Sequence, residues 1–363
     1  MKTFDEVFED RTKFGTKIQT NEYHKVGSFP IIDQGQDLIA GFTDRKEGLF
    51  SDVPAIIFGD HTRVVKYVDR PFFLGADGVK VLRSRFVGAN YKYLYYCLKN
   101  ARIPNTGYNR HYKWLKELQI QYPDLKKQSQ IVSVLEGISA CIELRKKQLC
   151  MFDNLIKARF VEMFGDSNNS KGYPLVKVQD VAEIQVGVVV KPAQYYTDAE
   201  HGVKAFRSLN IGELSIKDDD WVYFNEEGQR KNSKSILKEN DLVIVRSGAP
   251  GTACVVTKQF EGSNAVDVII AHPDAEKVNP YYLCAFTNFP HGKRQIDKGT
   301  GGAAQQHFNV GKYKEMDLIL PPKEEQDRFV AFVAQVNKSK VVVQKALDKT
   351  QHLFDSLMQK YFG

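Results

Sequence analysis

Four glycine-containing loops carry side chains of the kind that contact nucleic acid. Two of them, 58–63 and 106–111, lie in the first half of the chain, and two, 246–251 and 298–307, lie in the second half. Glycine lets backbone N–H groups approach a phosphate, while Arg, Asn, Gln and His carry the donors and acceptors that read base edges. Each loop taken alone could be an ordinary turn, but their equivalent placement in both halves favours a binding function.

Sequence motifs for catalysis are absent, which indicates a binding protein. No phosphate-binding G-x-x-x-x-G-K-[ST] loop occurs, because Gly311-Lys312 is followed by Tyr313 and the first glycine is missing. The string Asn279-Pro-Tyr-Tyr is similar to a motif of amino-methyltransferases, but no glycine-rich turn for a nucleotide-like cofactor accompanies it. The histidines include neither His-x-x-x-His nor His-Glu-x-x-His, and the cysteines form no C-x-x-C pair, so no metal site is predicted.

Composition and charge indicate ordinary globular material that could have a polyanionic partner. The 363 residues are 42% hydrophobic and 26% charged, and the length suggests two domains. No apolar run approaches the roughly 20 residues that span a bilayer, and no signal-peptide core follows Met1, so a cytoplasmic location is expected. The net charge of +7 permits a nucleic-acid partner without requiring one.

The second half of the chain repeats the first. A shift of 198 positions aligns residues 116–165 with 314–363 without a gap, with ten identities and a better-matched apolar pattern. Further upstream, 90–94 parallels 279–283 at a different shift, which indicates a loop insertion. The chain is therefore expected to be organised as module, helix, module, helix.

Two long amphipathic helices are predicted from heptad spacing. From Ile131 and again from Phe329, apolar positions advance by alternating steps of four and three for over four repeats. Each helix is expected to run about 40 residues, roughly 60 Å. The apolar seam residues are Ile131, Leu135, Ile138, Ile142, Leu149, Phe152 and Ile156, then Phe329, Val333, Val336, Val343, Leu347, Phe354 and Leu357, with Arg145, Arg159, Lys340 and Thr350 as polar interruptions.

Each seam needs a partner, because a helix of this length with one apolar stripe is not stable alone in water. The intervening module is long enough for the second helix to return antiparallel to the first. This predicts an intramolecular coiled coil with pseudo-twofold symmetry. The alternative is that each helix packs only on its own module, but the strict four-three spacing favours the coiled coil.

The two modules are expected to be of mixed α/β (α+β) class. Short β-rich runs broken by Gly, Pro and Asp predict strands, and a helix follows the strands in each module. The expected elements are strands at 29–32, 55–58, 63–68 and 78–82 with a helix at 91–98, and strands at 206–207, 242–245, 253–256 and 266–270 with a helix at 281–287.

The chain resembles the specificity (S) subunits of type I restriction-modification systems over essentially its whole length. The resemblance rests on the order of two modules and two helices, and on several strings that occur in the family's order. These strings are Asp33-Gln-Gly, Phe58-Gly-Asp-His-Thr, Pro174-Leu-Val-Lys-Val-Gln-Asp-Val-Ala-Glu-Ile-Gln-Val-Gly187 and Leu320-Pro-Pro-Lys-Glu-Glu-Gln326. No single string is specific, but their order is.

The resemblance implies two target recognition domains, at 1–122 and 174–320, that each read one half of a split site in double-stranded DNA. Spacer helices at 123–165 and 321–363, with a linker at 166–173, would set the half-site distance and dock two methyltransferase (M) subunits. A translocating restriction (R) subunit would join them for cleavage. The chain itself would be non-catalytic and hold no cofactor, because S-adenosylmethionine, ATP and Mg²⁺ belong to the partner subunits.

In this interpretation the target is bipartite and asymmetric, and helices of roughly 60 Å limit the half-site separation to fewer than about 17 base pairs. Lys25 and Lys191 are expected to be phosphate anchors or plain surface lysines. The alternative is a coiled-coil structural adaptor that binds protein partners without reading DNA. The candidate DNA-contacting residues are His61, Arg63, Tyr108 and Arg110 in the first domain, and Arg207, Arg246, Lys293, Arg294, Gln305 and Gln306 in the second.

Overall fold

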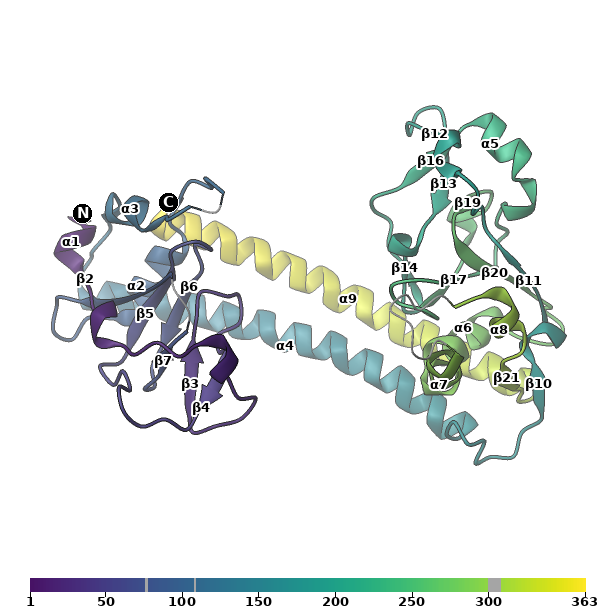
Figure 1. The fold of residues 1–363 in the computed structure, drawn as a ribbon, viewed down its shortest axis with the longest axis horizontal. Helices are drawn as coiled ribbons and strands as arrows, with labels where there is room; N and C mark the ends of the chain where they lie inside the picture. Colours follow the sequence, from purple (N-terminus) through teal and green to yellow (C-terminus); the bar gives the residue numbers. More distant parts are fainter. Residues whose placement is uncertain (76–77, 108, 300–307) are drawn as a thin grey trace. The chain divides into compact units, whose positions relative to one another are not determined.

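The structure, a computed structural model, describes residues 1–75, 78–107, 109–299 and 308–363 and divides into two compact units. Unit 1 comprises Met1–Lys147 together with Val343–Gly363. Unit 2 comprises Gln148–Val342. Each unit therefore holds one mixed α/β module and a part of each of two long helices (Figure 1).

Two small sheets form the module of unit 1. The larger is antiparallel, in the order β2 (Phe8–Asp10), β8 (Val79–Ser84), β5 (Ala55–Gly59) and β6 (Val65–Val68). The smaller has β3 (Phe29–Ile32) between antiparallel β4 (Gly41–Thr43) and parallel β7 (Phe73–Leu74), and β1 (Lys2–Thr3) pairs with β9 (Gln119–Ile120). The helices are α1 (Phe4–Val7), α2 (Tyr91–Lys99) and α3 (Tyr112–Lys116), with 3₁₀ turns at Thr12–Phe14 and Thr20–Glu22.

The module of unit 2 has the same plan with additions. Its main sheet has the order β11 (Ala182–Val186), β20 (Val268–Pro273), β17 (Leu242–Val245) and β18 (Ala253–Val255). A second sheet has the order β12 (Tyr196–Thr197), β16 (Val222–Phe224), β13 (Val203–Phe206) and β19 (Asn264–Ala265), and two pairs join β10 (Leu175–Lys177) to β21 (Asp317–Ile319) and β14 (Ile211–Gly212) to β15 (Ser215–Ile216). The helices are α5 (Glu226–Lys231), α6 (Pro280–Asn288), α7 (Pro290–Gly299) and α8 (Val310–Lys314), and 3₁₀ turns lie at Val178–Asp180, Pro192–Tyr195, Ser208–Asn210, Ser233–Ser235 and Lys258–Phe260.

The shared strand order confirms the internal repeat and the mixed fold class. Strands β2, β8, β5 and β6 correspond in order and pairing to β11, β20, β17 and β18. The parallel pair β3–β7 likewise corresponds to β13–β19. The strand expected at 266–270 begins two residues later, at Val268, because Asp267 adopts a left-handed backbone (φ +51°) between β19 and β20.

The central strand of each main sheet is buried on both faces, which explains its uninterrupted apolar sequence. In β5, Ile56 and Phe58 belong to the core beneath α2, whereas Ala55 and Ile57 belong to a second core on the opposite face. Strand β17 repeats this arrangement, with Leu242 and Ile244 in one core and Val243 and Val245 in another. Alternate side chains therefore join two cores in both modules.

Both long helices begin in the same way: a glutamine in the first turn donates to the carbonyl of a proline just before the helix. Helix α4 spans Leu125–Phe164 and helix α9 spans Lys323–Phe362. The fully buried Gln128 donates from Nε2 to the carbonyl of Pro123 at 2.8 Å.

No helix within the described ranges has both the length and the apolar composition needed to cross a membrane.

The two helices are antiparallel, because the first part of α4 packs with the last part of α9 in unit 1 and the reverse holds in unit 2. In unit 1, Leu135 and Phe354 share one core. In unit 2, the Phe160 and Phe329 rings lie 5.3 Å apart. All fourteen apolar seam residues predicted from the sequence are buried or half-buried.

The polar seam positions have specific partners. Arg145 Nη1 donates to the carbonyl of Ala346 at 2.8 Å. Lys340 Nζ pairs with Asp153 Oδ1 at 2.5 Å. Beyond Ile156 the buried positions of α4 advance by steps of four, through Phe160 and Phe164, rather than through Arg159. The helix there turns its apolar face toward the core of the module.

Candidate nucleic-acid interface

Both modules bring loops together where the central strand and the parallel strands end. In unit 1, Gln34 follows β3 and contacts the loop after β5, because its carbonyl accepts from Thr62 Oγ1 at 2.6 Å and its Oε1 accepts from His61 N at 3.2 Å. In unit 2, Arg207 follows β13 and Arg246 follows β17. Of the loops that the sequence singled out, 58–63 and 246–251 therefore occupy equivalent places, each after the central strand of its main sheet.

Arg246 is held by an aspartate that the sequence did not single out. Arg246 Nη1 lies 2.5 Å from Asp267 Oδ1. Asp267 has a left-handed backbone, and its N–H donates to the carbonyl of Val188 at 3.1 Å. Arg246 Nε is buried and has no hydrogen-bond partner among the described residues. The guanidinium is therefore fixed at one end and incompletely hydrogen-bonded at the other.

Arg207 has a matching arrangement. Its Nη2 lies 3.3 Å from Asp220 Oδ2 and also donates to the backbone carbonyl of Asp220. Asp220 is again left-handed, at φ +47°. Arg207 Nε is buried without a partner in the described part of the chain. Two predicted arginines of this module thus share the same pairing.

A third cation belongs to the same module. Lys204 Nζ lies 2.6 Å from Asp218 Oδ1, which also accepts from Trp221 Nε1 at 2.7 Å. The hydrogen bonds from Lys204 and Trp221 lower the pKa of Asp218. Lys204 Nζ also lies 4.8 Å from the centre of the Trp221 ring. The interface therefore combines positive charge with aromatic surface.

An apolar loop emerges beside Asp267. The Val188 carbonyl accepts from the Asp267 N–H, and Val189 and Val190, which follow it, are exposed. Gly187 is needed for this approach, because a Cβ atom there would lie 2.5 Å from the carbonyl oxygen of Ala265. Exposed valines beside paired arginines offer apolar contact as well as hydrogen bonds, and apolar contact is how thymine methyl groups are recognised.

Lys293 and Arg294 are adjacent in sequence but have different partners. Lys293 Nζ donates to the carbonyl of Pro250 at 2.6 Å, and burial lowers the pKa of Lys293. Arg294 instead donates from Nη1 to Ser167 Oγ in the linker. Lys293 therefore supports the loop after β17, whereas Arg294 ties α7 to the linker.

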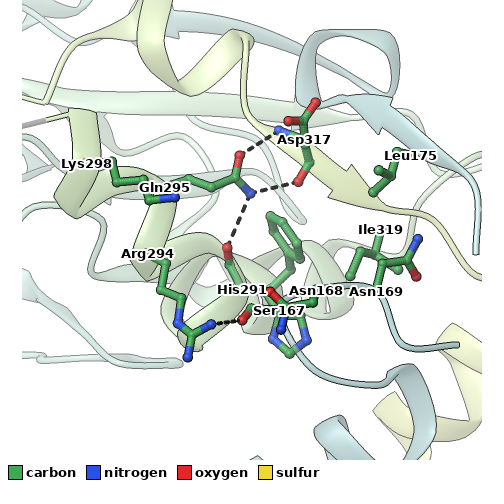
Figure 2. Close-up of a pocket in the computed structure, with 11 residues that line it drawn as sticks. Ser167, Asn168, Asn169, Leu175, His291, Arg294, Gln295, Lys298, Asp317 and Ile319 are labelled. Carbon is green, nitrogen blue, oxygen red and sulfur yellow. Dashed lines mark hydrogen bonds between the residues drawn. The ribbon is translucent and has the colours of Figure 1, made fainter. Parts of the chain in front are cut away.

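Arg294 lines a polar cavity of about 290 Å³ between α7, the linker and β21 (Figure 2). His291 is buried there and its Nε2 donates to the carbonyl of Gly165 at 2.9 Å. Gln295 contacts both the N–H and the carbonyl of Asp317, at 2.8 and 2.9 Å. These bonds join α7 to the residue that follows α4 and to β21 through main-chain partners.

A buried histidine, His111, organises two of the predicted loops of unit 1. His111 Nδ1 lies 2.9 Å from the carbonyl oxygen of Asp60, and because a carbonyl only accepts, Nδ1 carries the proton. Its Nε2 then accepts from Thr106 Oγ1 at 3.3 Å. Asp60 also accepts at Oδ1 from the Tyr112 N–H at 2.7 Å. These contacts join loops 58–63 and 106–111.

The predicted side chains of unit 1 lie around this junction. Arg63 has a left-handed backbone (φ +62°), and its Nη1 donates to the carbonyl of Ile103 at 3.3 Å. His61 is half-buried, while Arg110 is exposed and makes no side-chain hydrogen bond or ion pair within the described ranges. The remaining predictions, Tyr108, Gln305 and Gln306, lie outside the described residues.

Long-range pairing is what sequence reasoning missed. Lys66 is buried in unit 1, and its Nζ donates to the carbonyls of Asp33 and Asp37 at 2.8 and 2.5 Å. Burial lowers the pKa of Lys66, against the effect of the Asp33 carboxylate. Lys66 and Asp267 are each a charged residue inside an otherwise apolar run. That is the local signal that could have identified these two positions. Within the described ranges, no cluster of three or more His, Cys, Asp or Glu residues could hold a metal ion.

Comparison with protein families gives one match over most of the chain. A family model described as the type I restriction modification DNA specificity domain matches residues 1–150 and 168–349. The specificity subunit of the Escherichia coli type I restriction enzyme EcoR124I/EcoR124II is 28% identical over 161 residues, which are 39% of each protein. The MjaVIII specificity subunit of Methanocaldococcus jannaschii is 21% identical over 320 residues, 77% of this chain and 74% of that protein. The chain thus spans well under half of the E. coli relative.

Two solved structures share the fold. The type I restriction-modification S subunit from M. genitalium has a TM-score of 0.55 at 15% identity, covering 100% of this chain and 95% of that one. A chain from a study of complex assembly and conformational transition in the type I R-M system has a TM-score of 0.59 at 15% identity, with coverage of 99% and 95%. At this identity the likeness concerns architecture.

Proposed function

The chain belongs to the family of type I restriction modification DNA specificity domains, and from this we propose that it is the DNA sequence-recognition subunit of a type I restriction-modification complex. It reads a bipartite, asymmetric site in double-stranded DNA and has no catalytic role of its own. Methylation and cleavage belong to partner subunits that carry S-adenosylmethionine, ATP and Mg²⁺. Such a role implies a cytoplasmic location.

One observation carries this proposal: two modules of the same strand order hold different polar side chains at equivalent strand ends. Asp33 and Gln34 follow β3, whereas Arg207 follows the corresponding β13. Likewise His61 and Arg63 lie in the loop after β5, whereas Arg246 follows β17. Since base identity is read by side-chain donors and acceptors, the two modules should read different half-sites.

The proposed division of labour follows the repeat. The globular modules act as target recognition domains, and the helices act as spacers between them. DNA contact is assigned to the predicted side chains of both modules, apart from Lys293 and Arg294, which hold the loop after β17 and the linker. The proposed segments are 1–122 and 174–320 for the recognition domains, 123–165 and 321–363 for the spacer helices, and 166–173 for the linker.

The outer faces of the helices are the proposed docking surface for two methyltransferase subunits, which a restriction subunit joins. Leu144, Met151 and Leu155 are exposed on α4 at spacings of seven and four, away from the buried seam. In unit 1, Val134 and Leu353 also line an open groove of about 400 Å³ between α4 and α9. Exposed apolar side chains at helical spacing favour a helical partner.

Methylome sequencing of cells that express the chain with its methyltransferase partner tests this function. The expected result is methylation at one motif made of two short blocks with an unread gap of constant length. A single contiguous block would contradict the two-domain assignment. If the complex formed but showed no sequence preference in a binding assay at any salt concentration, the structural-adaptor alternative would replace DNA recognition.

A further inference from the structure

We propose that Asp267 and Asp220 are specificity-determining residues of the second recognition domain. Each holds an arginine in an ion pair that must be exchanged for DNA contact, and each lowers affinity for DNA of the wrong sequence. The inference rests on the proposed function, and it concerns acids that neither the motifs nor the resemblance singled out.

The first support is that both arginines share one pairing scheme. Arg246 Nη1 lies 2.5 Å from Asp267 Oδ1, and Arg207 Nη2 lies 3.3 Å from Asp220 Oδ2. Both aspartates have a left-handed backbone, at φ +51° and φ +47°. Residues held in this region cluster at functional sites, although Asp and Asn tolerate it better than most. Two independent segments therefore present a carboxylate in the same way.

The second support is how accessible these groups are to DNA. The Asp267 side chain is 46% exposed, whereas that of Arg246 is 17% exposed. The Asp220 side chain is 72% exposed, whereas that of Arg207 is 27% exposed. In each pair the carboxylate is therefore more accessible to a phosphate than the guanidinium is. The resulting repulsion acts on any duplex, whatever its sequence.

The third support is the unfilled hydrogen-bonding capacity of the arginines. In the paired state, the Nε–H groups of Arg207 and Arg246 are buried and have no partner among the described residues. A guanine edge is uncharged and offers two acceptors to one guanidinium, so it can satisfy the donors without bringing a negative charge up to the carboxylate. A phosphate, in contrast, brings a negative charge close to the carboxylate. The acids therefore penalise phosphate contact more than base contact.

The test uses the full chain assembled with its methyltransferase partner and isosteric substitutions. Asp267→Asn and Asp220→Asn remove the charge, and asparagine accepts the left-handed backbone. Asp274→Asn is the matched control: Asp274 follows the opposite end of β20 from Asp267 and pairs with Lys277 at 3.2 Å. Two duplexes of equal length serve as probes, one with the methylated motif and one scrambled.

For Asp267→Asn, affinity for the scrambled duplex should rise roughly tenfold at low salt, and its log–log salt slope should steepen by about 0.9, as expected for one more phosphate contact. Affinity for the cognate duplex should rise less, so the specificity ratio should fall. Asp220→Asn should act in the same direction. Asp274→Asn should leave both affinities and the slope unchanged.

Three other outcomes would overturn the inference, and the third of them would also overturn the proposed function. If wild type prefers its motif but neither Asn variant changes the specificity ratio, the acids do not discriminate and the recognition function stands. An equal loss of affinity for both duplexes would have the same meaning, because it indicates a structural role. If wild type shows no preference, the proposed function fails and the inference fails with it.

Discussion

The buried amide of Gln326 donates from Nε2 to the carbonyl of Pro321 at 2.9 Å and accepts at Oε1 from the Asn279 N–H at 2.8 Å. Gln128, its repeat equivalent, makes the same bond to Pro123 at 2.8 Å. The contact ties the start of each long helix to the turn before it. The same residue makes the same bond in both halves although most of the surrounding residues differ, which indicates a structural role.

Gln326→Ala should destabilise unit 2. The substitution leaves the Pro321 carbonyl and the Asn279 N–H without this partner in a buried place, and a loss of about 1–3 kcal/mol in the free energy of unfolding is expected. Gln335→Ala, an exposed position on the same helix, is the control and should change stability by less than about 0.5 kcal/mol. Denaturant unfolding of both variants measures the difference, and equal stabilities would refute the assigned role.

The coiled coil offers a second matched pair, because α4 carries a buried and an exposed leucine nine residues apart. Leu135 is fully buried, and Leu135→Ala should cost about 2–5 kcal/mol. Leu144 is 65% exposed, so Leu144→Ala should leave stability nearly unchanged while weakening association with the methyltransferase subunit. Thermal unfolding and co-purification separate the two effects. Undiminished co-purification of Leu144→Ala would remove this residue from the docking surface.

His291 should make unit 2 sensitive to mild acid. Burial lowers the pKa of His291 below its ordinary value of 6.5, and the bond to the Gly165 carbonyl only partly offsets this. Because the folded state binds the proton less well than the unfolded state, the stability contribution is complete above the unfolded pKa and declines as pH falls through the folded pKa.

The measurement is the midpoint of denaturant unfolding at pH 7.5 and at pH 5. Wild type should lose stability over this interval, and His291→Gln, which keeps a donor for the Gly165 carbonyl, should lose less. His352→Gln removes an exposed histidine from α9 and serves as the control, with the wild-type pH dependence expected. Identical pH dependence in all three proteins would exclude His291 as the titrating group.

Much of the architecture could be predicted from the sequence because it depends on local periodicity. The four-three spacing from Ile131 to Ile156 reports which face of a helix is covered, and this needs no knowledge of the rest of the chain. The internal repeat then predicted a corresponding helix in the second half of the chain. The four buried residues of β17 were equally visible, since a strand covered on both faces is apolar throughout.

The candidate site was less predictable because its contacts join residues far apart in sequence. Arg246 is positioned by Asp267, twenty-one residues later, and the tie depends on a left-handed turn between two strands. Lys293 and Arg294 looked equivalent in sequence, but successive residues on a helix point about 100° apart, so they meet different partners. Composition alone carries no information on either relationship.

The two modules should be separable by mutation. Arg246→Ala removes a candidate base contact from the second domain and should cost about 1–3 kcal/mol of discrimination, roughly 5- to 150-fold, at one base position. Only one block of the methylated motif should become degenerate. Arg110→Ala, at an exposed position of the first module, should affect only the other block.

Lys293→Met provides the internal comparison for this experiment. It keeps the length of the side chain but removes the donor to the Pro250 carbonyl, so it should relax the same block as Arg246→Ala with a smaller effect. Arg294→Met, whose partner is the linker residue Ser167, should lower thermal stability and leave the motif intact. Methylome sequencing reads all four variants. Degeneracy of both blocks in any single variant would mean that the modules are coupled, and independent half-site recognition would then be wrong.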